Sequence, residues 1–518
     1  MIGRESMIKN KLYLDLFLII FIIFFAVYFR ITTVNRPIND RMAWRQSEIY
    51  SMAFNFARND PNILNPSVFR ILPDKNLKGL YLLEFPIYEY LLSLVIRLFG
   101  DNIAYLRLFS ILLAALSSIS VFLIARKFTD RSAAFISAFI FNLLPSAVFW
   151  GRALSHDFFA MSLSTLAIAI VILKKSKFRY LVISSLLLGI VIATKPLYAA
   201  LIFLAPFLVD KKMFEVKLIR KVALISICLI GPFFVWIIRR HSVPSEILET
   251  TNLLFYVSGG SNYFQYLKDN DVVEYLLKNR LMGEVLTTLG GIILIIMIPV
   301  LSERKNPYDR FLLSWLSLVF TSIILFAWGN FNHDYYQIII LPIASLIIGH
   351  FLILLLKFLL KLRIIFSTAG FILFIFFGYY LWKLPFYKSL DDYYHPEVKY
   401  SEFSSDIDKV TSFVPENKYI GVFSYTDVET DPALINRLSR RGWNLYVSGD
   451  CDAGEWLSVL QNPNYALASF IILPKERYRM NNKNYCNYRP VESKILLEGQ
   501  YSKVYEGDYL ILFQKKTI

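Results

Sequence analysis

The first residues whose types and spacing could do chemistry lie just after the first long apolar stretch. Residues 40–48 read Asp-Arg-Met-Ala-Trp-Arg-Gln-Ser-Glu, so two carboxylates and two guanidinium groups fall within nine residues. A carboxylate can take a proton as a general base, and a guanidinium group can bind a phosphate. Residues 44–56 are predicted to form an amphipathic helix at a membrane interface, on which Arg45 and Glu48 share a face. A salt bridge on the surface of that helix is the alternative interpretation.

Two further carboxylates stand where apolar stretches begin. Glu84 precedes Pro86, a residue that suits the first turn of a helix, and the helix dipole favours a carboxylate at that end. Asp157 follows Arg152 and His156 at the start of another apolar stretch. A capping role accounts for Glu84 or Asp157 alone. The second group, however, contains more polar residues than a cap requires.

Two more polar groups interrupt or precede apolar stretches. Lys195 lies inside one and is followed by Pro196. A Lys-Pro pair at a break between two short helices could present its ammonium group to a phosphate, although a snorkelling lysine gives the same pattern. His333, Asp334 and Tyr335 stand at the start of another stretch. A membrane-interface belt explains the tyrosine, but it does not explain the histidine and the aspartate.

The composition predicts that membrane-spanning helices position these groups. The chain has 518 residues, of which 56% are hydrophobic and 18% are charged, whereas soluble domains carry about 25% charged residues. No small-residue cleavage site follows the first apolar stretch, so it is predicted to be a retained helix rather than a signal peptide. The net charge is +15. The basic residues are not clustered on one soluble face, so we expect no nucleic-acid partner. We expect instead that the excess of Lys and Arg lies in cytoplasmic loops and reflects the membrane topology.

About eleven spans are predicted, in a mainly α-helical transmembrane bundle. Lys and Arg gather at the N-terminus and in alternate loops, which indicates a cytoplasmic N-terminus and an extracytoplasmic C-terminus. We therefore expect a multi-pass protein of the plasma or inner membrane, with the polar groups described above on the extracytoplasmic side. The predicted spans are 12–30, 103–125, 132–150, 158–174, 181–195, 197–209, 222–238, 285–301, 311–328, 335–356 and 364–382.

The predicted domains are a transmembrane domain, 1–383, and a small extracytoplasmic α/β domain, 384–518. The first carries two long outer segments, 31–102 and 239–284. In the second, short strand-like runs alternate with helix-like ones. The strand-like runs are Tyr419–Tyr425, Leu445–Ser448, Phe470–Leu473 and Tyr509–Phe513, and the helix-like ones are Asp431–Arg440 and Glu455–Gln461. Trp443, Tyr446 and Trp456 are expected in the core of this domain, with stacking on sugars as the alternative. A disulfide between Cys451 and Cys486 is left open.

These segments resemble the GT-C superfamily of membrane glycosyltransferases, in particular relatives of the dolichyl-phosphate-mannose protein mannosyltransferases and of the aminoarabinose lipid A transferase. The resemblance covers about residues 10–380 and rests on the order of the motifs and on the topology. The motifs are Ala43-Trp44-Arg45-Gln46-Ser47-Glu48 with Asn55-Phe56, Glu84-Phe85-Pro86-Ile87-Tyr88, Arg107-Leu108-Phe109-Ser110, Arg152 to Asp157, Leu188-Gly189 with Thr194-Lys195, and His333-Asp334-Tyr335-Tyr336 with Pro342.

The resemblance implies transfer of a sugar from a polyprenyl-phosphate carrier in the membrane to an extracytoplasmic acceptor, with inversion at the sugar carbon. Such a reaction needs a carboxylate near the acceptor hydroxyl and cations for the leaving phosphate. The family's base matches Asp40 or Glu48, with Asp40 favoured, and a second acidic position matches Asp157. The residues implied for the carrier phosphate and the substrate cavity are Arg45, Gln46, Glu84, Arg152, His156, Lys195, His333 and Tyr335.

The sequence departs from the family at the proposed base. The family frequently has two adjacent acidic residues there, whereas Arg41 follows Asp40. This departure leaves the base undecided and weakens the case for a metal between the two outer loops. No cofactor is assigned from the sequence, and a divalent cation held by Asp40 and Asp157 is left open.

Two other classes of function compete with a transferase. A lipid-linked sugar flippase or polysaccharide transporter needs a polar path through the membrane, and few charged residues lie within the predicted spans. A receptor or scaffold that binds through its C-terminal domain leaves Lys195 and the outer carboxylates unexplained.

Overall fold

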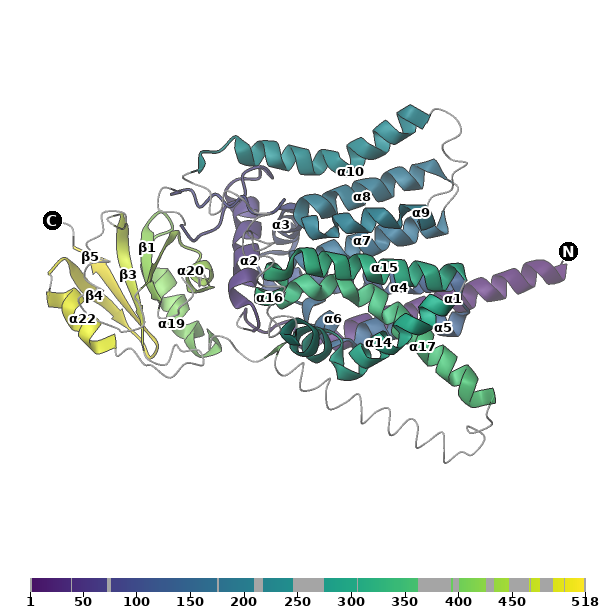
Figure 1. The fold of residues 1–518 in the computed structure, drawn as a ribbon. Helices are drawn as coiled ribbons and strands as arrows, with labels where there is room; N and C mark the ends of the chain where they lie inside the picture. The colour runs from purple at the N-terminus through teal and green to yellow at the C-terminus, as the bar shows by residue number, and fades with distance from the viewer. Residues whose placement is uncertain are drawn as a thin grey trace. The chain divides into compact units, whose positions relative to one another are not determined.

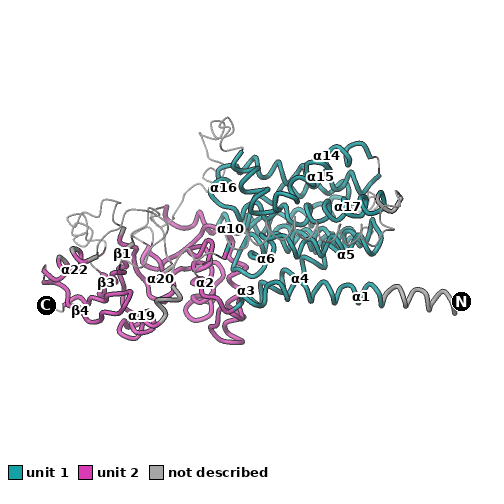
Figure 2. Tube along the Cα trace, turned by 90° about the horizontal axis from the view of Figure 1, so that it is seen from below, with its two compact units in different colours: residues 1–34, 107–238, 252–393 teal, residues 35–106, 239–251, 394–518 magenta. Residues whose placement is uncertain are grey.

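The fold is described from a computed structural model, in which the chain forms two compact units (Figures 1 and 2). Unit 1 comprises residues 1–34, 107–238 and 252–393, and unit 2 comprises 35–106, 239–251 and 394–518. The structure describes residues 2–38, 40–71, 76–174, 177–208, 218–245, 274–304, 306–361, 393–394, 400–424, 433–446, 465, 467–475, 488–497 and 499–516.

Unit 1 is built from helices (Figure 1). Six described helices are long and apolar enough to cross a membrane. The count is seven if η5 and α14, between which the helix axis bends by 118°, are one broken span. Its elements are α1 (Ile2–Ile31), α4 (Ile103–Phe128), α5 (Arg131–Leu143), α6 (Pro145–Trp150), α7 (His156–Leu173), α8 (Phe178–Thr194), the 3-10 helix η1 (Pro196–Leu204), α9 (Ala205–Leu208), α10 (Leu218–His241), the π-helix η5 (Tyr275–Val285), α14 (Thr287–Glu303), α15 (Pro307–Leu325), α16 (Ala327–Asn332), the 3-10 helix η6 (Asp334–Ile340) and α17 (Leu341–Lys361).

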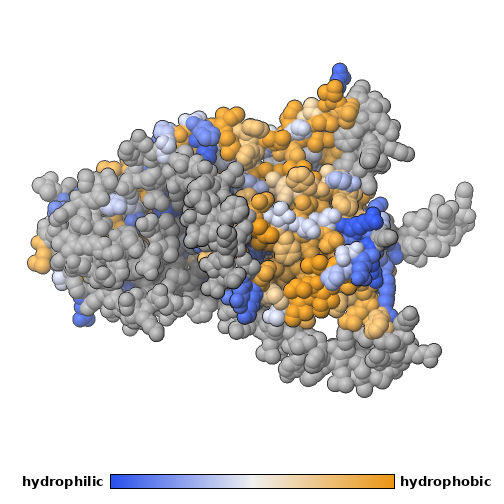
Figure 3. All heavy atoms as spheres, viewed as in Figure 1, coloured by the Kyte–Doolittle hydropathy of each residue, from blue (hydrophilic) through white to orange (hydrophobic). Residues whose placement is uncertain are grey.

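The apolar faces of these helices indicate an integral membrane protein. Hydrophobic side chains cover much of the face of unit 1 seen in Figure 3. In α10, only 6% of the most apolar window is buried, although that window has a mean hydropathy of 2.3. Large apolar side chains without protein cover are stable where lipid replaces water. The predicted count of eleven spans is not confirmed, and its last member, 364–382, lies outside the described residues.

Prolines shape two of the predicted spans. The stretch 132–150, predicted as one helix, is two helices, α5 and α6, because Leu144 is extended before Pro145. A proline disfavours the helical conformation of the residue before it. For the same reason α8 ends at Thr194, Lys195 is extended, and Pro196 opens η1. The predicted break at the Lys-Pro pair is thus confirmed.

The break between α5 and α6 packs around Arg30, whose side chain is fully buried. Its guanidinium group donates to the carbonyl of Ala147 at 2.9 Å, to that of Ala26 at 2.8 Å and to Oδ1 of Asn142 at 3.1 Å. Gly151 leaves room for this arrangement, since a Cβ there would lie 2.5 Å from both the Ala147 oxygen and Nε of Arg30.

Gly151→Ala is therefore expected to lower the melting temperature of the purified protein by several degrees. The added methyl group must displace a backbone oxygen and a buried guanidinium group, and overpacking of this kind costs about 1–3 kcal/mol. Gly231→Ala is the matched control, because a Cβ there meets only Ile227, at 4.0 Å. Equal melting temperatures for the two variants would contradict the tight packing at Gly151.

Unit 2 contains a five-stranded sheet and five helices among its described residues. The strand order is β2-β1-β3-β5-β4, with β1 parallel to β2 and β3, and β5 antiparallel to β3 and β4. The elements are α2 (Ala43–Arg58), α3 (Ile87–Phe99), α19 (Tyr400–Phe413), β1 (Tyr419–Ser424), α20 (Ala433–Leu438), β2 (Gly442–Tyr446), β3 (Ala468–Pro474), α22 (Tyr488–Leu497), β4 (Tyr501–Glu506) and β5 (Leu510–Lys515).

Alternation along the strands builds a core on each face of the sheet. Ile420 and Ile472 pack with the apolar side chains of α19 and α20, whereas Ile471 and Trp443 pack on the other face with those of α22. Three of the predicted strands and the helix near Asp431–Arg440 are confirmed, as is the core position of Trp443. The fourth predicted strand, Leu445–Ser448, overlaps β2 only at Leu445 and Tyr446, because β2 begins at Gly442. The predicted helix Glu455–Gln461, Trp456, Cys451 and Cys486 lie outside the described residues.

The sequence prediction missed β4, α19 and α22. Strand β4 lies at the edge of the sheet, and only Tyr501 of its six residues is buried. Such a strand lacks the apolar run by which the other four strands were predicted, because one edge and one face of it contact solvent.

Candidate active site

Lys195 is the centre of a buried polar cluster in unit 1. Its side chain is 4% exposed, and Nζ lies 3.0 Å from Oδ2 of Asp157. The Lys-Pro break places Lys195 between α8 and η1, and Asp157 lies in the first turn of α7. An ammonium group this deeply buried needs a partner, so the snorkelling interpretation of Lys195 is wrong.

Aromatic rings complete the surroundings of Lys195. Nζ lies 5.4 Å from the ring centre of Tyr335 and 4.8 Å from that of Tyr336, both in η6. His333 stacks on Tyr335 with ring centres 5.1 Å apart, and Trp150 meets the same ring edge-on at 5.7 Å. Ring faces attract cations and exclude water. The cluster thus holds a positive charge in a site shielded from water, where it acts strongly on any nearby anion.

At the start of α7, one residue caps the helix and another takes part in the polar cluster. Ser155, not Asp157, caps the helix, because its hydroxyl oxygen accepts from the Phe158 amide at 3.2 Å. Asp157 is therefore available to pair with Lys195, and its backbone carbonyl accepts from the Tyr198 hydroxyl at 3.2 Å. The neighbouring His156 is also buried. The capping interpretation of Asp157 is thus wrong.

Arg152 lies in the turn before α7 and is fully buried. Its guanidinium carbon lies 5.3 Å from the ring centre of Phe149. With Lys195, it gives unit 1 a second buried cation near the start of α7. Within this unit the structure therefore brings together Asp157, Lys195, Tyr335 and His333.

Unit 2 holds a second polar cluster, around Glu48 on α2, and this carboxylate is fully buried. Arg70 donates to its Oε1 at 2.7 Å, and Arg45 donates to its Oε2 at 3.3 Å. The Tyr81 hydroxyl donates to Oε2 at 3.0 Å. Both oxygens of this carboxylate are therefore occupied by donors from three side chains. The pair of Arg45 and Glu48 is buried, so the surface salt-bridge interpretation is wrong.

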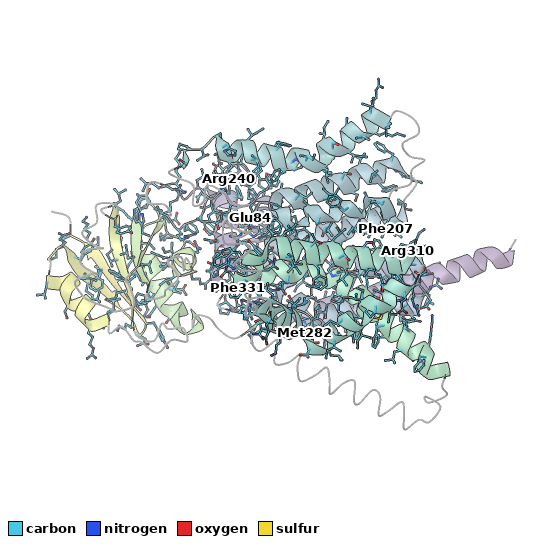
Figure 4. All side chains as sticks on the ribbon, viewed as in Figure 1. Glu84, Phe207, Arg240, Met282, Arg310 and Phe331 are labelled. Carbon is cyan, nitrogen blue, oxygen red and sulfur yellow. The ribbon has the colours of Figure 1, made fainter. Side chains whose placement is uncertain are left out.

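Arg45 connects Glu48 to the segment before α3. Its guanidinium group also donates to the Tyr81 hydroxyl at 2.8 Å and pairs with Glu84. Helix α3 begins at Ile87, so Pro86 is its N-cap residue rather than part of its first turn, and no side chain caps the helix. Glu84 is thus an ion-pair partner rather than a cap. Arg240 donates to the carbonyl of Leu82, two residues before Glu84 (Figure 4).

Asp40 lies at the turn that leads into α2 and is 1% exposed. The amide of Gln46 donates to its Oδ1 at 2.8 Å. The turn between them includes Met42, whose φ of 54° is in the left-handed region that bulky residues seldom adopt. Strained backbone of this kind persists where the fold holds it and is common at functional sites.

Tyr50 anchors the middle of α2. Burial, together with the neighbouring carboxylate of Asp101, raises the pKa of Tyr50 well above its ordinary value. Its hydroxyl therefore stays protonated at physiological pH and donates to both oxygens of Asp101 at 2.8 Å. This contact helps to fix the helix that carries Arg45, Gln46 and Glu48.

Sequence reasoning missed Arg70, Tyr81 and Tyr336 as members of these clusters. Arg70 and Tyr81 follow Glu48 by 22 and 33 residues in segments without a recognisable motif. Tyr336 belongs to the motif His333-Asp334-Tyr335-Tyr336, but it was given no role in the site, although its place next to His333 and Tyr335 was a usable signal.

The residues do not fit a metal at Asp157. Among the described residues, no group of three or more His, Cys, Asp and Glu side chains could hold a metal ion. The Asp157 carboxylate already pairs with the Lys195 ammonium group, and that positive charge opposes a divalent cation at the same oxygen. No step proposed below therefore uses a metal.

The comparisons with known proteins agree with this architecture. The family model described as "Dolichyl-phosphate-mannose-protein mannosyltransferase" matches residues 84–236, which contain Asp157 and Lys195. No curated protein matches the sequence significantly.

Solved structures resemble the chain over nearly its whole length. ArnT from Cupriavidus metallidurans, bound to undecaprenyl phosphate, has a TM-score of 0.59 at 10% identity, with 98% of each chain covered. Archaeal oligosaccharyltransferase AglB from Archaeoglobus fulgidus, with an inhibitory peptide and a dolichol-phosphate, has a TM-score of 0.55 at 15% identity, covering 90% of this chain and 70% of that one. Arabinofuranosyltransferase AftD from Mycobacteria has a TM-score of 0.54 at 13% identity, covering 97% and 41%. These neighbours are all GT-C glycosyltransferases, and the chain therefore has the GT-C fold.

Proposed function

We propose that the protein is an integral membrane glycosyltransferase that moves a sugar from a polyprenyl-phosphate carrier to a hydroxyl of a lipid, glycan or protein. The observation that carries the proposal is the buried ammonium group of Lys195, which is held by Asp157 and by the rings of Tyr335 and Tyr336. Lys195 and Asp157 lie inside the segment that matches the mannosyltransferase family model. A carrier phosphate is the anion that such a site favours. The GT-C neighbours bound to undecaprenyl phosphate and to a dolichol-phosphate support the same carrier class.

The proposed reaction is a direct displacement. The acceptor oxygen bonds to the anomeric carbon from the face opposite the carrier, and the bond from that carbon to the phosphate oxygen breaks. The electron pair leaves on the phosphate, and the acceptor proton goes to a carboxylate. Because attack and departure occur on opposite faces, the sugar carbon is inverted.

Asp40 suits the role of base better than Glu48. Both oxygens of Glu48 already accept from the guanidinium groups of Arg45 and Arg70, whereas Asp40 lies in the turn before α2, where the family resemblance places the base. Lys195 and Arg45 are proposed to bind the carrier phosphate, with Asp157 and Glu84 orienting these two cations. Gln46, Arg152, His156, His333 and Tyr335 are proposed to complete the substrate cavity.

The isoprenoid chain of the carrier needs an apolar place in the membrane. A cavity of about 260 Å³ in unit 1 is lined almost wholly by apolar side chains of α7, α8, η1, α9 and α10, among them Leu181, Leu188 and Leu229. We propose that it receives part of that chain. From the basic residues of alternate loops, we also propose that the N-terminus is cytoplasmic and that transfer occurs on the extracytoplasmic face.

A transfer assay in proteoliposomes tests the function. The purified protein is given polyprenyl-phosphate sugars labelled in the sugar, together with membrane lipids and glycans as acceptors. We expect the label to appear in an acceptor, with the configuration at the anomeric carbon inverted in the product. Passage of the labelled carrier across the bilayer without a transferred product would instead support the flippase alternative.

A further inference from the structure

We propose that the C-terminal sheet domain, residues 400–516 of unit 2, is a positioning element for the Arg45–Glu48 cluster rather than a separate acceptor-binding appendage. The proposal rests on the proposed function, because it assumes that this cluster serves sugar transfer. Two contacts carry it, and both end beside Glu48.

The first contact extends the sheet with a piece of the first outer segment. The amide of Ile71 donates to the carbonyl of Gly442 at 2.8 Å, and the amide of Gly442 donates to the carbonyl of Phe69 at 3.1 Å. Residues 69–71 thereby continue the parallel pairing beyond β2, with Arg70 opposite Gly442. Such added backbone pairing fixes which residue of this segment lies opposite Gly442.

Side-chain burial locks this register. Phe69 belongs to the core on one face of the sheet, with Ile420, and Ile71 belongs to the core on the other face, with Trp443. Arg70 lies between these two buried residues, and its guanidinium group lies 2.7 Å from Oε1 of Glu48 on α2. The position of the Arg70 guanidinium group is thus set by the C-terminal domain.

The second contact reaches α2 directly. Asn436 of α20 is fully buried, and its amide donates to the hydroxyl of Ser47 at 3.2 Å. Ser47 precedes Glu48 in the chain. Phe54, further along α2, packs against the same core as Phe69. The sheet domain therefore holds both the backbone beside Glu48 and the cation that binds its carboxylate.

Glu48 and Glu84 in turn fix the guanidinium group of Arg45, which is proposed to bind the carrier phosphate. Misplacement of a binding group by about 1 Å can lower a rate by about a hundredfold. Loosening the sheet domain from α2 should therefore reduce the use of the donor. A separate acceptor-binding appendage would instead change only the apparent affinity for the acceptor.

Steady-state kinetics of Asn436→Ala, in the full-length protein in nanodiscs, test the proposal. We expect kcat/KM for the polyprenyl-phosphate sugar to fall about tenfold to a hundredfold, with the KM for the acceptor unchanged. Gln514→Ala is the matched control, because this amide is exposed on β5 of the same domain. A rise in acceptor KM with donor kinetics unchanged would overturn the proposal.

A second variant and a second readout separate the causes of failure. Gly442→Ala places a Cβ 2.1 Å from the carbonyl oxygen of Ile420, so it should loosen residues 69–71 and hasten protease cleavage between residues 59 and 80. Asn436→Ala should also hasten this cleavage, and Gln514→Ala should not. If the wild type and Gln514→Ala transfer no sugar, the proposed function fails, and the cleavage rates alone decide whether the domain holds the segment. Wild-type cleavage rates in both Asn436→Ala and Gly442→Ala would overturn the positioning role.

Discussion

Replacing Lys195 with alanine is expected to lower kcat/KM for sugar transfer by about two to three orders of magnitude, the loss typical of removing one group that stabilises developing charge. The Lys195 ammonium group is buried, 3.0 Å from Asp157, and it faces the rings of Tyr335 and Tyr336. As the bond to the carrier breaks, negative charge grows on the phosphate. A cation in a site with little water stabilises that charge strongly. Initial rates at varied donor concentration measure the loss.

A compensated variant separates this catalytic effect from misfolding. Alanine leaves the buried carboxylate of Asp157 without its cation, and breaking a buried pair costs about 3–5 kcal/mol. The double variant Lys195→Met with Asp157→Asn removes both charges, so we expect it to restore the melting temperature but not transfer. Lys278→Ala is the control, because the Lys278 side chain is 73% exposed and pairs only with a neighbour one turn away, Glu274, among the described ion pairs. Recovered transfer in the double variant would remove Lys195 from the mechanism.

Asp40→Asn is expected to lower kcat by about 10²–10⁴-fold, the range for loss of a general base. Asparagine has the shape of aspartate but does not accept a proton at physiological pH. Its amide oxygen can still accept from Gln46, as Oδ1 of Asp40 does at 2.8 Å, so the turn before α2 should be kept. Binding of polyprenyl phosphate, measured by thermal shift, should be unchanged while transfer is lost.

Glu48→Gln is the matched comparison for Asp40→Asn. This change leaves the guanidinium groups of Arg45 and Arg70 without the carboxylate between them. We expect a lower melting temperature and a smaller loss of transfer than for Asp40→Asn. The opposite result, with transfer abolished in Glu48→Gln at an unchanged melting temperature and kept in Asp40→Asn, would falsify the assignment and make Glu48 the base.

The local elements of this protein could be predicted from short stretches of sequence. Apolar runs gave the positions of α1, α4, α7 and α10, and short strand-like runs gave those of β1, β3 and β5. Pro86 and the pair Lys195-Pro196 marked where helices begin and end. These features depend on steric restrictions and on burial within a few neighbouring residues, so the sequence alone was sufficient.

Local rules failed where two neighbouring residues could serve the same purpose. Ser155 and Asp157 are both good capping residues, and only packing decided that the serine caps α7 while the aspartate pairs with Lys195. The same holds for Glu84, which was read as a helix-end carboxylate and instead pairs with Arg45.

By itself, the sequence determined that this chain is a membrane-embedded helical protein with a small α/β domain and several polar groups at the ends of its helices. The tertiary structure decided which of these groups are partners. It paired Lys195 with Asp157, 38 residues earlier, and surrounded Glu48 with Arg70 and Tyr81. Helix and strand formation depends on neighbours in the chain, whereas the pairing of buried charges depends on which distant segments the packing of the core brings together.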